Sequence, residues 1–187
     1  MKKIISAILL LASMLFVLAS CSSSDTPDGM QLVYGGAKAG YYFYVPEDWV
    51  VDEQTGMTSA HLSARDRTNV SVTTYEASSA LSTMEAFWTK YEQDFTATYG
   101  EIAYTTAADG TQNRAIARTL GGQPALAYEY KRAFLGTTYC VNQALVMYQN
   151  RFYLFTFMGL AGEGNESYAP NVDTGCITDM LTFFAFK

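Results

Sequence analysis

The sequence has few of the residues on which common active sites depend. It contains one histidine, His61, among 187 residues, together with three cysteines. A Ser-His-Asp or Cys-His relay needs an imidazole that passes a proton near neutral pH, and no GxSxG motif accompanies the histidine. His61 falls on a predicted strand, where the simpler interpretation is a half-exposed structural residue. We therefore expect no catalytic residue and no enzyme activity.

The sequence also lacks a recognisable ligand set for a metal or a nucleotide. One histidine and scattered cysteines do not match zinc spacing, and Gly162–Glu166 is too poor in acids for a calcium loop. The glycines of Gly159–Gly164 do not follow the GxGxxG spacing of a dinucleotide turn, and they come after a predicted antiparallel strand. The acidic pairs Glu47-Asp48 and Asp52-Glu53 are neighbours in predicted exposed turns, as on a solvated surface. We expect no metal and no cofactor.

The sequence has fewer basic than acidic residues. The 12 Lys and Arg face 18 Asp and Glu, which gives a formal net charge of −6. Such an acidic chain is unsuited to nucleic acid, and to anionic lipid through a basic patch. The run Arg65-Asp66-Arg67 lies in a predicted connection, where it keeps the loop soluble or docks a partner. The charge balance therefore argues against nucleic acid as a partner.

An apolar run stands near the amino terminus. Lys2 and Lys3 precede the mostly apolar run from Ile4 to Val17, which continues into Leu18-Ala19-Ser20-Cys21. A positive start, a short apolar run and small residues before a cysteine are typical of a signal peptide with a lipobox. A transmembrane anchor is the alternative, but the run is short for a bilayer, which needs ~20 apolar residues. The pattern predicts cleavage before Cys21 and lipid on its thiol.

Cleavage divides the chain into a signal peptide (1–20), a tether (21–30) and a single domain (31–187). The mature chain has 167 residues (187 − 20) and a net charge of −8 (−6 − 2), because two lysines are removed. The tether, CSSSDTPDGM, has almost nothing to bury, which predicts a flexible segment with a reach of roughly 20 Å. We expect an exported protein, lipid-anchored to the outer face of the cell membrane, or to the outer membrane in a two-membrane cell.

Two cysteines remain in the domain once Cys21 carries lipid. Cys140 and Cys176 lie in apolar patterns, where cysteine often packs as a small hydrophobic residue. In an exported protein the same two thiols can form a disulfide. The sequence leaves both alternatives open.

Aromatic residues are abundant, at 14% of the sequence, and many stand in short segments typical of strands. The long segments Thr138–Gln149 and Phe152–Met158 flank Asn150-Arg151 and predict a hairpin. Gly121-Gly122 and Gly136 mark two further turns. The remaining expectations are strands at Gln31–Tyr34, Tyr41–Val45, Trp49–Val51, Ser59–Ser63, Val70–Tyr75, Ile102–Thr106, Arg114–Thr119 and Ala125–Arg132, and a loop at Gly159–Asn165.

Two helices are predicted to cover the sheet. Ser82 and Glu85 are spaced as a capping box before a helix over Thr83–Tyr99, and Gly100 stands where a C-terminal cap belongs. A second helix is expected over Tyr168–Phe186 from its apolar spacing. The first helix carries one apolar stripe, which we expect to press on the sheet. The stripe consists of Met84, Phe87, Trp88, Tyr91, Phe95 and Tyr99.

The order of these segments and several of their sequences resemble a known family. The segments are GYYFYVPEDWVV, NVSVTTYEA, the helix around EAFWTKYEQDF, the hairpin QALVMYQNRFYLFTF and the closing ITDMLTFFAF. An aromatic strand that runs into Val45, Pro46 and Trp49 has the most weight. The chain resembles the PsbP-like family over nearly everything after the tether. The resemblance implies an α+β fold with a mainly antiparallel sheet sandwiched between helices, and it transfers no catalytic residue.

Three hypotheses about function follow. The first is a non-catalytic lipoprotein whose domain acts as a scaffold or interaction module for another envelope protein. The second is a small-ligand binder with a pocket between sheet and helix, and the remote third is a hydrolase. A bare apolar patch would favour the first, a pocket lined by aromatic and polar groups the second, and a buried His61 beside a carboxylate and a hydroxyl the third.

Overall fold

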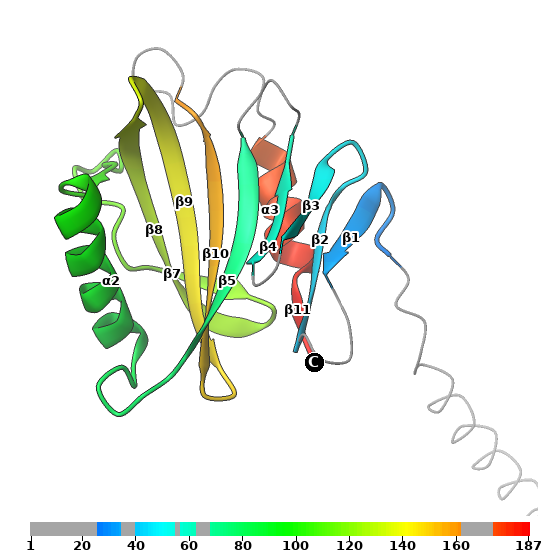
Figure 1. Cartoon of the computed structure of the whole chain (residues 1–187), viewed down its shortest axis with the longest axis horizontal. Helices are drawn as coiled ribbons and strands as arrows, with labels where there is room; N and C mark the ends of the chain where they lie inside the picture. Colours follow the sequence, from blue (N-terminus) through cyan, green and yellow to red (C-terminus); the bar gives the residue numbers. More distant parts are fainter. Residues whose placement is uncertain (1–25, 35–39, 55–56, 63–67, 162–173) are drawn as a thin grey trace, which may run out of the picture.

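Antiparallel strands make up most of the protein (Figure 1). The computed structural model describes residues 26–34, 40–54, 57–62, 68–161 and 174–187. The helices in these ranges are α2 (Met84–Tyr99) and α3 (Thr174–Phe183). The strands are β1 (Met30–Tyr34), β2 (Tyr41–Pro46), β3 (Val50–Gln54), β4 (Met57–His61), β5 (Asn69–Glu76), β6 (Ala103–Tyr104), β7 (Ile116–Leu120), β8 (Gln123–Phe134), β9 (Thr137–Tyr148), β10 (Arg151–Leu160) and β11 (Ala185–Phe186).

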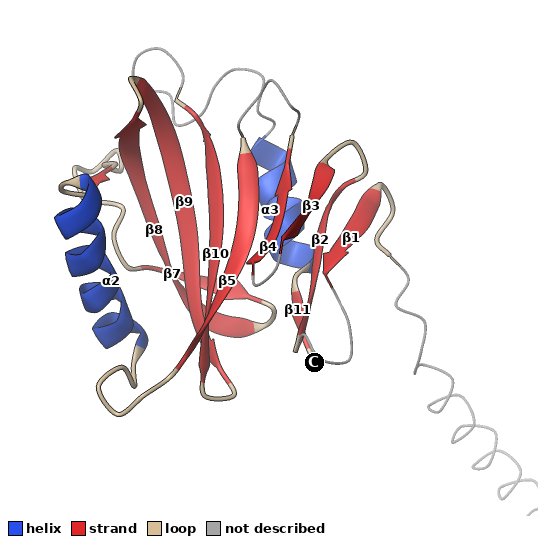
Figure 2. Ribbon diagram, in the orientation of Figure 1, coloured by secondary structure: helices blue, strands red, loops and turns tan. Residues whose placement is uncertain are grey.

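Eight strands form one large sheet. Its order is β3-β4-β5-β10-β9-β8-β6, and β7 pairs with β8 as well. A second sheet has the order β1-β2-β11, and Figure 2 shows it beside the β3–β4 end of the large sheet. The strand pairs of both sheets are antiparallel. No helix in the described ranges is long and apolar enough to span a membrane.

Two-residue turns set the register of three hairpins. In each turn both residues have a positive φ, which defines the type I′ turn, and the twist of that turn matches the twist of the flanking strands. The turn predicted at Asn150-Arg151 lies one residue earlier, because Arg151 already pairs with Tyr148. The turns, with their φ angles, are Gly121-Gly122 (57° and 75°), Leu135-Gly136 (50° and 77°) and Gln149-Asn150 (47° and 62°).

The large sheet has an apolar core on each face. Phe152 and Leu154 of β10 belong to the core under α2, whereas Tyr153 and Phe155 belong to the core that contains α3. This alternation follows from the period of two along a strand. Because both faces are buried in the middle of the sheet, β9 and β10 are apolar over most of their length.

The α+β class and the mainly antiparallel sheet are confirmed, but the predicted sandwich between helices is not. Most of the described chain is strand. On the face away from α2, Phe43 and Val45 of β2 share the core with Met180 of α3. The small sheet therefore occupies part of a layer that was expected to be helical.

The start of α2 differs from the prediction by one residue. The N-cap is Thr83, whose Oγ1 accepts a hydrogen bond from the Ala86 amide at 3.1 Å. Glu85 is then two residues after the cap instead of three, so the capping box predicted from Ser82 and Glu85 is wrong. The predicted end is confirmed, because Gly100 has a φ of 89° and its N–H donates to the Thr96 carbonyl.

The closing segment ends as a strand and not as a helix. α3 stops at Phe183, and Ala185 and Phe186 form β11 against β2. The Phe186 ring contacts the rings of Tyr148 and Tyr153, with centroids 4.5 and 5.0 Å away. An extended backbone is what places this ring among them. The part of the predicted helix before Thr174 lies outside the described residues.

The predicted loop after β10 begins later than expected. Gly159 and Leu160 continue the strand, where they pair with Cys140 and Tyr139 of β9. These two pairs form because β9 begins at Thr137 and so reaches the end of the sheet at which β10 ends. The rest of the predicted loop, beyond Ala161, lies outside the described residues.

Candidate functional site

A row of polar side chains crosses the face of the large sheet on which α2 lies. Directly opposed residues of an antiparallel pair point to the same face. Asp52 of β3 is opposite Ser59 of β4, which is opposite Ser71 of β5. The row continues through Thr156 of β10 to Gln143 of β9. We call these five residues the polar row.

Gln143 is the buried end of the polar row, with 2% of its surface exposed. Its Nε2 donates to Thr156 Oγ1 at 2.9 Å and to the Tyr91 hydroxyl at 3.1 Å. Its Oε1 accepts from the Tyr130 hydroxyl at 3.0 Å. Burial raises the pKa of Tyr130, which keeps this hydroxyl protonated as the donor. The amide is therefore bonded at both ends, and it ties α2 to three strands.

Asp52 lies at the outer end of the polar row, where it pairs with His61 and accepts a hydrogen bond from Ser59. His61 Nδ1 lies 2.9 Å from Asp52 Oδ1, and Ser59 Oγ donates to Asp52 Oδ2 at 3.1 Å. The side chains of His61 and Asp52 are 29% and 26% exposed. The carboxylate thus orients the imidazole through Nδ1, and Nε2 is the nitrogen that remains for a ligand. Asp52 belongs to β3, so its predicted place in an exposed turn is wrong.

This cluster does not have the order of a nucleophilic relay. In such a relay the hydroxyl bonds to the imidazole, and the imidazole bonds to the carboxylate. Here Ser59 bonds to Asp52 instead. His61 is half-buried on its strand, as predicted, and is not the buried histidine that the hydrolase hypothesis required. Within the described ranges, no three His, Cys, Asp or Glu side chains are grouped to hold a metal.

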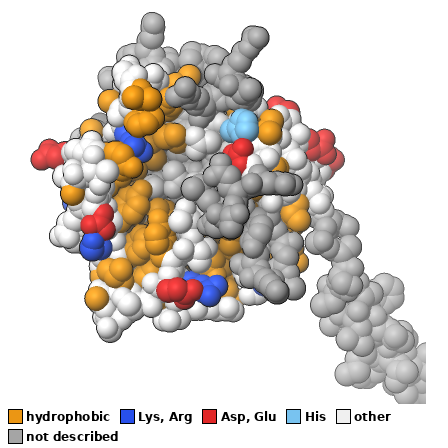
Figure 3. All heavy atoms as spheres, in the orientation of Figure 1, with side chains coloured by type: hydrophobic (Ala, Val, Ile, Leu, Met, Phe, Trp, Pro, Cys, Tyr) orange, Lys and Arg blue, Asp and Glu red, His pale blue; other side chains and the backbone are white. Residues whose placement is uncertain are grey.

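Part of this sheet face is not covered by α2. The helix packs on β8, β9 and β10, and the view in Figure 2 shows it away from β3 and β4. Most side chains on this side of β3, β4 and β5 are exposed or half-buried. Figure 3 shows the histidine with an acidic neighbour on this side, and hydrophobic side chains gathered between it and α2. The open face, as we call it, consists of Val50, Asp52, His61, Asn69, Ser71 and Thr73.

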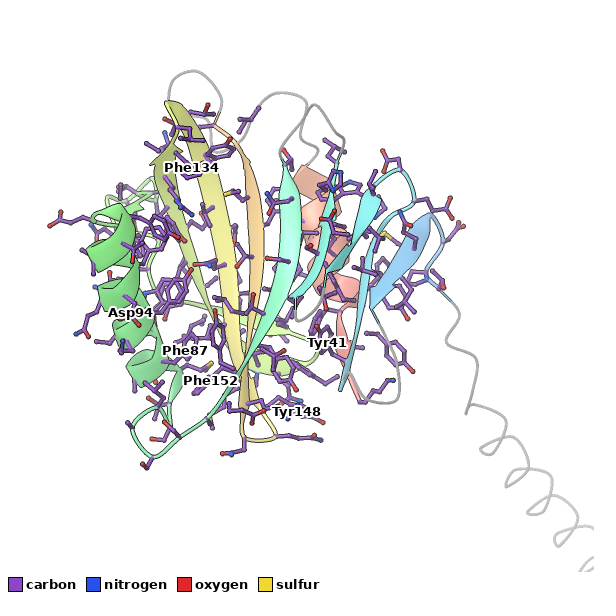
Figure 4. All side chains as sticks on the ribbon, in the orientation of Figure 1. Tyr41, Phe87, Asp94, Phe134, Tyr148 and Phe152 are labelled. Carbon is purple, nitrogen blue, oxygen red and sulfur yellow. The ribbon has the colours of Figure 1, made fainter. Side chains whose placement is uncertain are left out.

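A second feature is an exposed apolar tip at the turn between β8 and β9. We define the apolar tip as Tyr99, Phe134 and Leu135, which are 58%, 45% and 81% exposed. Figure 4 shows Phe134 at the end of the β8–β9 hairpin, beyond the end of α2. Tyr99 is the last residue of α2. The predicted stripe of α2 is thus buried at Phe87, Trp88 and Phe95, but its last member is uncovered.

Arg132 joins the two parts of the apolar tip. Its guanidinium carbon lies 4.1 Å from the Tyr99 ring centroid and 5.4 Å from that of Phe134. The Phe95 ring is 5.2 Å away. Cation–π attraction therefore holds the end of α2 beside the hairpin. Among the described residues Arg132 has no ion-pair partner, and its Nε is buried without a hydrogen bond.

Several predicted sites fall outside the described part of the chain. Cys21, Arg65–Arg67 and Gly162–Glu166 are among them, so their predicted roles stay predictions. Cys140 is buried on β9, and burial raises the pKa of its thiol. Cys176 lies on α3, but its side chain is outside the described set. The disulfide between the two cysteines therefore stays a prediction.

The sequence analysis missed both the polar row and the apolar tip. The polar row depends on the pairing of five strands, and no linear pattern encodes that register. The apolar tip did have a signal, because Leu135 precedes Gly136 at a position where a type I′ turn favours Asn, Asp or Gly. A leucine at this position does not favour the turn, which indicates a role other than turn formation.

Comparison with known proteins identifies the fold. No family model matches the sequence, and neither does any curated protein. The solution structure of cyanobacterial PsbP (CyanoP) from Synechocystis sp. PCC 6803 matches with a TM-score of 0.58 and 15% identity, over 91% of this chain and 99% of that one. A crystal structure of a protein from Bacteroides thetaiotaomicron VPI-5482 matches with a TM-score of 0.54 and 10% identity, over 85% of this chain and 48% of that one.

These matches show a PsbP-like fold, as the sequence resemblance implied. A weaker match, to LpqN of Mycobacterium tuberculosis, has a TM-score of 0.35 and 12% identity over 87% of this chain and 80% of that one, and it carries no argument. At such identities the likeness concerns the fold alone, because one fold serves many functions.

Proposed function

We propose that this protein is an exported lipoprotein whose PsbP-like domain is a non-catalytic interaction module of the cell envelope. The amino-terminal lysines, the short apolar run and the lipobox before Cys21 support export and acylation. Several acyl chains on one cysteine make anchoring durable, at about 0.8 kcal/mol for each buried methylene. Residues 21–30 set the reach of the domain, so its partner lies close to the membrane.

The open face is the observation that carries the interaction role. It combines hydrogen-bonding groups with exposed apolar residues, since Val50 is 49% exposed and Tyr75 of β5, at its border, is 36% exposed. Protein interfaces have this mixed composition, with about one hydrogen bond for each 100–200 Å². The oriented Asp52–His61 pair adds a directional polar contact. We infer that another envelope protein binds here.

The polar row supports a second candidate, a small polar ligand. Thr156 and Ser71 continue the row from the bonded Gln143 outward to Asp52. Their hydroxyl groups stand on a rigid sheet beside the aromatic residues of α2, and such an arrangement suits ligand recognition. A ligand of this kind would raise the melting temperature of the purified protein as its concentration increases. If the site binds a protein partner instead, no small molecule in such a screen should raise the melting temperature.

The anchoring is tested by Cys21→Ser in the full chain. We expect no product of the processed size in the membrane fraction from this variant, because the thiol that accepts lipid is gone. Labelled fatty acid should enter the unaltered chain and not the variant. Membrane association of the variant at the processed size would contradict the proposal.

The interaction is tested by photo-crosslinking of the intact lipoprotein in its native membrane. A photoreactive residue replaces Ser71 on the open face or, as a matched control, Gln93, which is exposed on α2. We expect a discrete adduct from position 71 alone. The same adduct from both positions, or none from position 71, would argue against the open face as the binding surface.

A further inference from the structure

The apolar tip brings large exposed apolar side chains together from two elements. Leu135 and Phe134 come from the β8–β9 hairpin, and Tyr99 comes from the end of α2. Exposure of such residues forgoes the free energy that burial would supply. Leu135, at 81% exposed, gains almost nothing from the folded protein. The fold therefore does not account for an apolar residue at this position.

The backbone at Leu135 makes the choice of leucine more costly. Its φ is 50°, and the Cβ of an L-residue makes the left-handed region unfavourable by about 1–2 kcal/mol. The equivalent turn between β9 and β10 uses Gln149 and Asn150, and both are exposed polar residues. Leucine at this tip is thus unfavourable for the turn and for solubility. Backbone strain of this kind is often found at functional sites.

Arg132 places a cation beside the apolar tip. Its guanidinium is held under the rings of Tyr99 and Phe134, and no carboxylate of the described residues neutralises it. A guanidinium pairs strongly with phosphate oxygens, often through two hydrogen bonds. This arrangement matches a membrane interface. Apolar side chains there contact acyl chains, aromatic rings lie at headgroup level, and cations pair with phosphates.

We propose that the apolar tip inserts into the surface of a phospholipid membrane and sets the orientation of the anchored domain. Leu135 and Phe134 enter the boundary of the acyl chains, the Tyr99 ring lies at headgroup level, and Arg132 pairs with a lipid phosphate. The β8–β9 hairpin then stands on the membrane, and the open face is turned to the side. The contact depends on apolar insertion, so the net negative charge of the domain does not prevent it.

The size and shape of the apolar tip favour a lipid surface over a protein partner. Residues Ala133–Gly136 are all exposed, as at a protruding end. Three side chains supply far less than the roughly 800 Å² that each partner contributes to a stable protein interface. A bilayer needs no complementary shape and accepts a convex end.

The tether keeps the domain near a membrane, and it joins the molecule at β1, away from the β8–β9 hairpin (Figure 1). Five residue steps separate Cys21 from Thr26, the first described residue, and they span at most about 18 Å when extended. With lipid on Cys21 the membrane is at high effective concentration, so a weak contact is enough to orient the domain. The inference uses the proposed anchoring for this proximity only, because the insertion itself does not need the lipid.

Vesicle binding of the unlipidated protein tests the insertion. The mature chain with Cys21→Ser is mixed with vesicles of phosphatidylcholine, alone or with phosphatidylglycerol, and sedimented. We expect binding to both, and Leu135→Asn should lower the partition coefficient roughly tenfold or more, which corresponds to the loss of one buried leucine. Asparagine suits the positive φ, so the variant keeps its fold. Leu32→Asn, which removes another exposed leucine, is the matched control and should bind as before.

A reporter at the apolar tip gives a direct readout of depth. Phe134→Trp should show a blue shift of its emission with vesicles and quenching by brominated acyl chains. Trp49 and Trp88 are 5% and 2% exposed, so they contribute a constant background. Emission that vesicles do not change would overturn the insertion.

The outcomes separate this inference from the proposed function. Loss of binding in Leu135→Asn alone supports the insertion, whether or not position 71 gives an adduct. Absence of binding, or equal loss in Leu32→Asn, overturns the insertion and leaves the crosslinking result standing. A protein adduct from a photoreactive residue at position 135, without vesicle binding, would assign the apolar tip to a protein partner and overturn the inference.

Discussion

The Trp88 indole lies flat on the Tyr128 ring, with centroids 3.4 Å apart and planes inclined by 7°. The two residues are 2% and 1% exposed and join α2 to β8. Trp88 Nε1 donates to the Tyr104 hydroxyl at 2.9 Å, and that hydroxyl donates to Glu92 Oε1, also at 2.9 Å. Arg114 pairs with the same carboxylate. Trp88 thus connects the helix to two strands of the large sheet, β8 and β6.

We predict that Trp88→Ala lowers the free energy of unfolding by about 3–5 kcal/mol, because it removes a large ring from a packed site. Urea denaturation followed by circular dichroism measures the change. Tyr104→Phe is the control, since it removes the hydroxyl and keeps the ring, and should cost about 1 kcal/mol. Equal losses from the two variants would mean that the stacked ring contributes no more than its hydrogen bond.

The N-cap of α2 gives a second prediction, which distinguishes the observed register from the predicted one. Thr83→Ala should cost about 1 kcal/mol of stability, because it leaves the Ala86 amide without its acceptor. Ser82→Ala should have almost no effect. A larger loss of stability from Ser82→Ala than from Thr83→Ala in denaturant titrations would instead support the capping box predicted from the sequence.

The turn at Leu135 gives a third prediction. Leu135→Asn should raise the free energy of unfolding by roughly 0.5–1 kcal/mol, because asparagine tolerates the left-handed backbone that leucine does not. Gln149→Asn, at a φ of 47° in the equivalent turn, should give a gain of the same sign. A loss of stability in the first variant and a gain in the second would mean that the leucine side chain contributes to the fold.

The sequence predicted most of the elements because they follow local rules. The runs rich in aromatic and β-branched residues in β2, β5, β9 and β10 and the apolar stripe of α2 are visible without knowledge of the fold. The prediction failed where a distant partner decides the outcome. Ala185 and Phe186 have helical spacing with the residues before them, yet they become extended because β2 and the rings of Tyr148 and Tyr153 offer a partner.

Alkaline pH gives a fourth prediction. Burial raises the pKa of Tyr130 in the folded protein, whereas an unperturbed tyrosine titrates near pH 10. Above about pH 10 the unfolded chain releases a proton that the folded protein keeps, so the free energy of unfolding falls as the pH rises. Below about pH 10 Tyr130 does not lower the stability. The loss grows as the pH rises from there toward the pKa that Tyr130 has in the folded protein. Tyr104 adds to this loss, since burial raises its pKa to about 12.

Tyr130→Phe separates this titration from other alkaline effects. The variant loses the hydrogen bond to Gln143 and should be less stable by about 1 kcal/mol below pH 10. Its stability should then fall less steeply than that of the unaltered protein between pH 10 and pH 11 in urea titrations. Parallel pH profiles would show that Tyr130 does not take part in the alkaline transition.

The candidate sites were less predictable than the elements. His61 was expected on a strand, but its contact with Asp52 depends on the β3–β4 register, which puts the two residues on one face. Arg132 gave no signal, because its aromatic neighbours come from a helix and a hairpin that are far apart in sequence. Surfaces that combine separate elements have no linear pattern, so they emerge only from the fold.

The pairing of β11 with β2 has a consequence for the time at which folding is completed. β2 (Tyr41–Pro46) and β11 (Ala185–Phe186) are far apart in the sequence, so the three-stranded sheet closes only after residues 185 and 186 have been made. A chain that crosses a membrane amino end first would complete this sheet only after residues 185 and 186 had emerged. Closure of the three-stranded sheet would therefore follow export of the strands that form the large sheet.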